Sequence, residues 1–383
     1  MKTFNWKDIM KRSIFMLKIL GLWPPGDTYK FDFYSAYSFV SIAAFTCGHN
    51  FFQIINICFI FPDLEVIAAT IFVTLPELLV IMKTYYVIQN MQLLKQLMVD
   101  INQEHFEPRS LSQVEMIQPS LSFLRKISTV LWSMSAGAVF FSATYPILDG
   151  SVKEHRLPRP AWYPYDATVS PLYQITYVYQ IFSFTFIAAT ALTTDTLIAI
   201  LNLFVGAQCD ILCDDLKDIF REDHLNFGRN KFLSCIRHHK EILRFADSSN
   251  IFFNRIVFVQ FFISTSSIGI TMFQLTVTEP LTSEFFLLVS FNIAIVVEIF
   301  IYCWFGNEVE LKSSAIPTAI FHSNWLKAHM IIKKDLRFFL MRCQRPIKVS
   351  ALNLFYLSLE TFVKILRGSW SYFALLNQAT FQK

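Results

Sequence analysis

Apolar residues dominate seven long stretches of the chain, and shorter segments between them hold most of the charged residues. A helix needs about 20 apolar residues to cross the roughly 30 Å hydrocarbon core of a bilayer, and every stretch reaches that length. The stretches are Asp32–Phe61, Leu64–Asn90, Leu124–Leu148, Leu172–Val205, Ile251–Val277, Phe285–Phe305 and Ala351–Phe381. The alternation that is typical of a membrane β-barrel is absent. The pattern predicts an all-α membrane protein with seven transmembrane helices.

Composition supports this class of protein. Of the 383 residues, 54% are hydrophobic and only 16% are charged, whereas a soluble domain carries roughly 25% charged residues. So much apolar surface excludes a disordered chain. The formal net charge of +4 is close to balanced for this length. We therefore expect no nucleic-acid partner.

The positions of the basic residues predict the orientation in the membrane. Of the 33 Lys and Arg residues, 27 are assigned to the side of the N-terminus and four to the opposite side, and two lie within helix 7. The 27 include four that lie within predicted helices and are counted with the adjoining connections: Lys83, Arg125, Lys126 and Arg255. Cytoplasmic connections carry the excess of Lys and Arg. The N-terminus is thus predicted to be cytoplasmic and, after seven spans, the C-terminus extracellular.

The predicted cytoplasmic segments also show helical spacing. Residues 1–31 interleave basic and apolar residues, which predicts an amphipathic helix along the membrane surface. Ile211–Phe220 and Trp325–Met341 repeat apolar residues at helical spacing between charged ones. We expect these helices to extend beyond the membrane and pack together, with membrane-surface helices as the alternative. The predicted division is 1–31, 32–205 (helices 1–4), 206–250 (connection), 251–305 (helices 5 and 6), 306–350 (anchor) and 351–383 (helix 7).

Candidate metal and catalytic groups are sparse. The seven cysteines form no regular framework and are interpreted as mostly free thiols. Cys209 and Cys213 lie one helical turn apart, with His238 and His239 downstream, but the second ligand pair of a zinc site is missing. No Gly-x-Ser-x-Gly or His-Glu-x-x-His motif occurs. We expect no enzyme activity, no metal and no cofactor.

The predicted topology weighs against two familiar classes of membrane protein. A metabotropic seven-helix receptor places its N-terminus outside, and this chain has no Asn-x-Ser/Thr acceptor for glycosylation. Secondary transporters are typically built from repeated halves with Gly/Pro-broken helices, and no such repeat is visible among only 10 glycines.

Several short motifs then carry a family resemblance. They are Gly21–Pro24, Leu157–Asp166, Tyr302–Glu308, Ser313–Ala315 followed by Ala319 and Trp325, and Ser371-Tyr372 followed by Gln378. In this order, and with the inverted topology, the set resembles the insect odorant receptor family over essentially the whole chain. The closing motif is similar to the Thr-Tyr-x5-Gln-Phe ending shared with gustatory receptors, with Ser371 in place of Thr and Ala379 in place of Phe. A gustatory receptor channel and a metabotropic receptor stay as alternatives.

The resemblance implies an odorant-gated, non-selective cation channel of four subunits around one pore. Helix 7 would line the pore, and the cytoplasmic ends of helices 4 to 7 would anchor the tetramer. The short connection 206–250 is similar to that of tuning subunits, which work with a shared co-receptor. Implied partners are a small volatile organic ligand, the co-receptor, membrane lipid, and permeating monovalent and divalent cations. The implied location is the plasma membrane of sensory neuron dendrites.

The resemblance also places an odorant pocket in the outer half of helices 2 to 6. Apolar and aromatic walls with a few hydroxyl groups suit a volatile ligand. Candidates that share helix faces are Ile67, Thr70, Ile71 and Thr74; Met134, Gly137 and Phe141; Tyr173, Tyr177, Ile181 and Phe184; and Phe286, Ser290 and Phe291. Ordinary packing between helices is the alternative interpretation of each residue.

Near the end of helix 7, the candidate pore residues are Ser371, Tyr372, Leu375, Gln378 and Ala379. A ring of Leu375 side chains would close a pore by excluding water, and Gln378 would form a polar ring beside it. A lipid-facing helix end is the alternative.

Three carboxylates lie within predicted membrane helices: Glu77, Asp195 and Glu298. Ionisable residues in membrane helices are costly unless they are paired. We expect structural pairing with basic side chains, with an ion-path role as the alternative.

Overall fold

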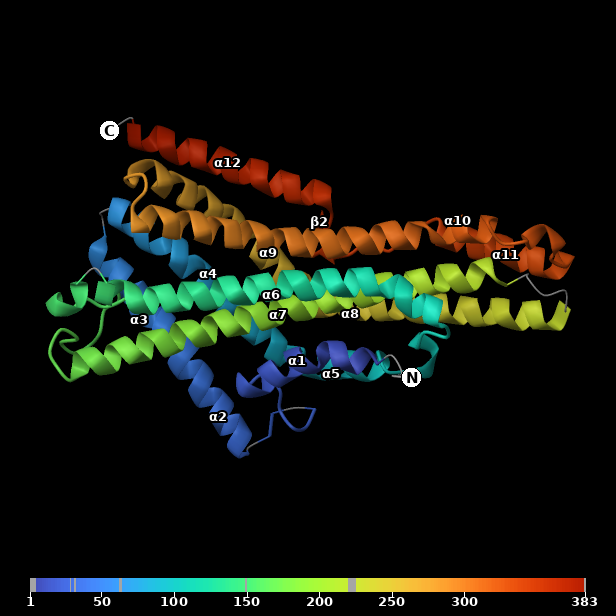
Figure 1. Cartoon of the computed structure of the whole chain (residues 1–383), viewed down its shortest axis with the longest axis horizontal. Helices are drawn as coiled ribbons and strands as arrows, with labels where there is room; N and C mark the ends of the chain where they lie inside the picture. The colour runs from blue at the N-terminus through green and yellow to red at the C-terminus, as the bar shows by residue number, and fades with distance from the viewer. Residues whose placement is uncertain are drawn as a thin grey trace.

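The computed structural model describes residues 5–27, 29–30, 32–61, 64–148, 150–219 and 225–381, apart from a few side chains within them. Its helices are α1 (Trp6–Ile19), α2 (Phe33–Ser41), α3 (His49–Ile60), α4 (Leu64–Gln89), α5 (Met91–Asp100), α6 (Leu111–Leu148), α7 (Leu172–Lys217), α8 (Leu225–Val277), α9 (Ser283–Ser314), α10 (Ile316–Phe321), α11 (Met330–Cys343) and α12 (Leu359–Phe381). The long helices lie along one axis, and α12 runs along an edge of the bundle (Figure 1). The all-α prediction is confirmed.

Six segments of the described chain are helical, long and apolar enough to cross a membrane: Phe33–Ile60, Thr70–Gln89, Leu111–Thr144, Leu172–Lys217, Gly228–Val277 and Phe285–Phe321. The first combines α2 and α3 through a π-helical turn at Ile42–Gly48. The seventh predicted helix is α12, which has 23 residues but carries Glu360, Lys364 and Arg367. Helix α12 is therefore amphipathic rather than uniformly apolar, which matches a helix that needs a partner on its polar face.

Two helices are much longer than a bilayer is thick. Helix α7 has 46 residues and α8 has 53. At 1.5 Å per residue they are about 70 and 80 Å long, against a hydrocarbon core of about 30 Å. They continue through the segment 206–250, in which the sequence predicts a helical connection. Within Ile211–Phe220, α7 ends at Lys217, and Phe220 lies outside the described residues.

An aromatic cluster joins α1, the segment before α6, α7 and α8. The Phe204 ring of α7 lies 4.8 Å from Trp6, 5.2 Å from Phe106 and 4.7 Å from Phe245, between ring centroids. The Trp6 indole donates a hydrogen bond to the Phe106 carbonyl oxygen at 3.1 Å, and Gln208 donates a second at 2.9 Å. This core fixes α1 and the turn before α6 against α7 and α8.

Helix α1 has the amphipathic pattern predicted for the N-terminal segment. Its apolar side buries Trp6, Met10 and Leu17, and the helix packs on α7. Protein side chains therefore cover this face, and the location of α1 along the membrane surface stays a prediction.

The segment before α12 folds as a small antiparallel hairpin, β1 (Ser350–Ala351) with β2 (Phe355–Tyr356). Helix α12 consequently begins at Leu359 and not at Ala351, where the sequence predicts its start. Leu352 and Asn353 have positive φ angles of 51° and 57°, which end any helix at this turn. The hairpin holds the inner end of α12 against the bundle.

Gly306 of α9 makes a close approach to this segment possible. A Cβ atom at Gly306 would lie 2.3 Å from the Leu357 Cβ and 2.5 Å from its carbonyl oxygen. The Leu357 backbone could avoid this clash only by moving away from α9. Helix α9 and the start of α12 therefore touch through the bare glycine backbone.

We expect Gly306→Ala to lower the melting temperature of the purified protein, because the added methyl group forces α9 away from Leu357. Gly137→Ala in α6 is the matched control, since a Cβ there meets nothing within 4 Å. Glycine in a helix interior costs roughly 0.5–1 kcal/mol relative to alanine, so the control should be neutral or slightly stabilising. Equal melting temperatures for the two variants would contradict the close approach.

Candidate ligand site, polar networks and pore helix

A buried ammonium group joins three helices inside the bundle. Lys83 of α4 lies 2.6 Å from Asp195 Oδ1 of α7 and 3.0 Å from Glu298 Oε1 of α9. The Tyr302 hydroxyl of α9 donates to the same Asp195 oxygen at 2.5 Å. The Lys83 side chain is only 1% exposed. Two of the carboxylates noted in the sequence are thus paired with one lysine.

The third carboxylate, Glu77, pairs with the loop between α6 and α7. Arg159 forms an ion pair with Glu77, and its guanidinium lies 3.9 Å from the centroid of the Phe184 ring of α7. His49 of α3 lies 3.3 Å from the other Glu77 oxygen. Arg159 therefore links α4, through Glu77, to α7, through Phe184. The same Glu77 carboxylate also faces His49 of α3.

The loop that carries Arg159 is held against α7 by hydrogen bonds between the Gln180 side chain and the loop backbone. Gln180 of α7 accepts from the Arg159 amide and donates to its carbonyl oxygen, both at 3.1 Å. It also donates to the Tyr163 hydroxyl at 3.2 Å. The Tyr165 hydroxyl lies 2.8 Å from the Thr176 hydroxyl. The motif Leu157–Asp166 thus packs against the N-terminal part of α7 through these hydrogen bonds.

A separate apolar cluster connects α4, α8 and α9 to α12. Phe72 and Phe291 meet edge to face with ring centroids 5.3 Å apart. Buried Ile270 and Leu288 complete the cluster, and Leu376 of α12 packs against it.

The structure divides the predicted ligand residues into groups. Ile71 and Phe291 belong to the apolar cluster, and buried Thr70 and Thr74 lie beside it on α4. The Thr74 hydroxyl donates to the Thr70 carbonyl at 3.0 Å. The side chain of Ile67 lies outside the described residues.

A second group lies on α7, near the loop. The Tyr173 hydroxyl donates to the Arg156 carbonyl at 3.1 Å, and the Tyr177 hydroxyl donates to the Ala143 carbonyl of α6 at 2.7 Å. Phe184 contacts Arg159. Ile181 and Met134 are half-buried, whereas Gly137, Phe141, Phe286 and Ser290 are exposed. The assignment of all these residues to an odorant pocket stays a prediction.

Helix α12 has two different faces. Its packed face touches α8, where a Cβ at Gly269 would lie 2.5 Å from the Tyr372 ring. Ser371, Leu375 and Gln378 are exposed on the single chain, with Leu375 63% exposed. The side chain of Ala379 lies outside the described residues. Four of the five predicted pore residues are therefore exposed on the single chain, although the Tyr372 ring also lies against α8.

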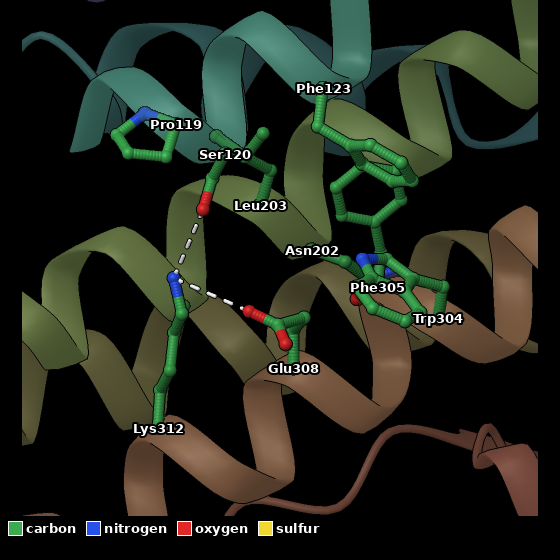
Figure 2. Close-up of a pocket in the computed structure, with 10 residues that line it drawn as sticks. Pro119, Ser120, Phe123, Asn202, Leu203, Trp304, Phe305, Glu308 and Lys312 are labelled. Atoms are coloured by element: carbon green, nitrogen blue, oxygen red, sulfur yellow. Dashed lines mark hydrogen bonds and ion pairs between the residues drawn. The ribbon is translucent and has the colours of Figure 1, made fainter. Parts of the chain in front are cut away.

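Two pockets of the described chain lie elsewhere, and no predicted ligand residue lines either one. One, of about 270 Å³, lies between α6, α7 and α9 (Figure 2). The other, of about 360 Å³, lies between α1, α6 and α7, where Arg12 stacks over Trp132. Both pockets lie far along α7 from the loop that carries Arg159.

The described residues contain no group of three or more His, Cys, Asp or Glu side chains able to hold a metal ion. All seven cysteines are free thiols. Burial raises the pKa of the Cys343 thiol in α11 to about 12, so it is protonated at neutral pH. His238 instead contacts Gln208 at 2.9 Å, within the aromatic core.

Sequence reasoning named the three membrane carboxylates but missed Lys83, Arg159, Phe72 and Leu376. A lysine within an apolar stretch was a usable signal for Lys83, because an intramembrane cation needs an anionic partner. Nothing in the sequence places the loop residue Arg159 near Glu77 of α4.

Fold and networks together define a multi-span helical membrane protein with a covered outer end and an amphipathic edge helix. The family model described as the 7tm odorant receptor matches residues 63–370. This chain belongs to that odorant receptor family.

Individual relatives agree. Odorant receptor Or1 of Anopheles gambiae is 26% identical over 426 residues, covering 98% of this chain and 96% of that protein. Odorant receptor 10 of Aedes albopictus is 25% identical over 313 residues, covering 78% of this chain and 80% of that protein. The structure of the olfactory receptor OR5 from Machilis hrabei in complex with eugenol superimposes with a TM-score of 0.85 at 19% identity, over 98% of both chains.

We expect Lys83→Met to lower the melting temperature strongly, because it leaves Asp195 and Glu298 without a cation; removing one member of a buried ion pair costs about 3–5 kcal/mol. The triple variant that adds Asp195→Asn and Glu298→Gln should recover much of the loss.

Lys364→Met is the control, since Lys364 pairs with Glu360 on the exposed face of α12; exposed pairs contribute little. Thermal unfolding of detergent-purified variants is the measurement. A triple variant as unstable as Lys83→Met would show that packing, and not charge compensation, sets the loss.

Proposed function

We propose that this odorant receptor is a tuning subunit of an odorant-gated, non-selective cation channel. Four subunits, including a co-receptor, surround a pore lined by α12 in the plasma membrane of sensory neuron dendrites. The carrying observation is that α12 contacts the apolar cluster through Leu376 while it exposes Leu375 and its polar neighbours on the opposite side.

The exposed face of α12 supports the pore assignment. Ser371 and Gln378 are hydrophilic side chains near the end of a membrane helix; exposing them to hydrocarbon is unfavourable, whereas a water-filled path solvates them. Leu375 lies between them and supplies an apolar ring that excludes water when the pore is closed. Side-chain oxygens without an acidic ring suit weak discrimination among cations.

The apolar cluster supports the coupling. A volatile ligand has few polar atoms and gains affinity from apolar burial, about 25 cal/mol per Å². A ligand seated between Phe72 and Phe291 repacks the contact with Leu376. A ligand that binds the repacked state more tightly than the resting state shifts the channel toward its open form.

The experiment co-expresses this chain with a co-receptor and records whole-cell currents against a broad panel of volatiles, with and without G-protein inhibitors. Rapid cation currents that persist under the inhibitors are expected. Currents abolished by the inhibitors, together with an extracellular N-terminal epitope tag on intact cells, would instead establish a metabotropic receptor.

We expect Leu375→Ala to raise the resting conductance, because a smaller side chain widens and wets the closed pore. Val363→Ala is the matched control: Val363 is exposed on the same helix but lies about 120° around it at 3.6 residues per turn. An unchanged leak with normal surface expression would remove Leu375 from the gate.

We expect Phe291→Ala to raise the half-maximal odorant concentration by roughly 10- to 100-fold, because the ligand would lose its apolar contact with this partly buried ring. Phe262→Ala on α8 removes a ring that is 71% exposed and should leave the dose–response curve in place. If both variants respond like the unmodified receptor, the ligand binds away from this cluster.

A further inference from the structure

The pocket between α6, α7 and α9 has both an apolar wall and a polar rim (Figure 2). Trp304 and Phe123 form the wall, with ring centroids 5.4 Å apart. Lys312 lies at the rim, 2.7 Å from Asp210, 3.5 Å from Glu308 and 3.3 Å from the Ser120 hydroxyl. The volume of about 270 Å³ is close to the lower end of small-molecule pockets, about 300 Å³.

A buried amide in this pocket has no partner. Asn202 lines the pocket and is only 2% exposed, and its Nδ2 has no hydrogen-bond acceptor within the described part of the chain. An unsatisfied buried donor costs about 1–3 kcal/mol. An oxygen atom of a bound molecule would remove that penalty.

The charges around the rim select the kind of molecule. One ammonium group, Lys312, already faces two carboxylates and a hydroxyl group. An anion would therefore meet a surplus of negative charge. The orphaned Nδ2 donor calls for an acceptor oxygen, and the aromatic wall calls for an apolar body. The complementary ligand is a neutral amphiphile.

The position of the pocket makes the bilayer its source. Asn202 lies 30 residues after Leu172 on α7, about 45 Å from the loop-covered end at 1.5 Å per residue. Trp304 lies 21 residues into α9, or about 32 Å. The distance along α9 places the pocket near the opposite boundary of a core about 30 Å thick, and the distance along α7 places it at or beyond that boundary, on the side with the basic connections.

We propose that this pocket is a second ligand site, separate from the odorant cluster, that binds a neutral amphiphile with one hydrogen-bond-accepting oxygen. The oxygen accepts from Asn202 Nδ2, and the apolar body lies against Trp304 and Phe123. Both a medium-chain alcohol dissolved in the bilayer and the ester region of a phospholipid have this chemistry.

The experiment photolabels the full-length receptor in nanodiscs and maps the adducts by mass spectrometry. One arm uses a diazirine-bearing octanol, and the other a phosphatidylcholine with a diazirine on one acyl chain. Labelling on pocket peptides of α6, α7 or α9 that unlabelled octanol displaces is expected in at least one arm, and the labelled arm identifies the source. The readout needs no channel current, so it stands apart from the proposed function.

Two variants test the assignment. Asn202→Leu should lower pocket labelling about two- to tenfold, the effect of one lost hydrogen bond. Gly206→Leu fills the pocket, where its Cβ would meet only the flexible Lys312 side chain at 3.2 Å, and should abolish labelling. Ala138→Leu, at an exposed position on α6, is the matched control. Labelling that does not saturate, or that persists in Gly206→Leu, would overturn the proposal.

Discussion

The position of one buried charge constrains this bundle more than any other feature. The Lys83 ammonium sits among Asp195, Glu298 and the Tyr302 hydroxyl. An unpaired ion at that depth costs several kcal/mol, so α4, α7 and α9 can separate only by exposing charge. The rotations of these three helices are thereby fixed relative to one another. On either side, the loop network of Arg159 and the aromatic core around Phe204 add further contacts between the helices.

This arrangement leaves α12 at the edge of the bundle, where it packs on α8 and α9. It is held at its inner end by the hairpin and by the contact of Leu357 with Gly306. Farther along, it touches the apolar cluster through Leu376. In the proposed channel, a change in the cluster would reach α12 through its contact at Leu376.

Much of the fold was predictable because lipid imposes a simple rule on sequence. Long apolar runs give the spans, and Leu64–Gln89 matches its predicted range almost residue for residue. Helix ends were less predictable, since α7 and α8 continue far into charged sequence where protein packing replaces lipid.

The candidate site shows the same division. Hydropathy identifies Glu77 and Asp195 as unusual but cannot name their partners, because Arg159 and Lys83 reach them across 82 and 112 residues of chain. Helical spacing grouped Ile71 with Thr74, but it gave no rotation for α4, so Phe72 was missed. The polar face of α12 was visible from sequence, whereas its contact with the apolar cluster was not.

The most direct test of the coupled pore asks whether the exposed face of α12 lines the ion path. Ser371→Cys and Ser369→Cys differ in position only: Ser371 is exposed, and Ser369 is 1% exposed against α8. With a co-receptor, an extracellular cationic thiol reagent should reduce the odorant-evoked current of Ser371→Cys, and faster while odorant is present. Ser369→Cys should be unaffected. Equal modification of both, or modification without effect on current, would contradict a pore lined by α12.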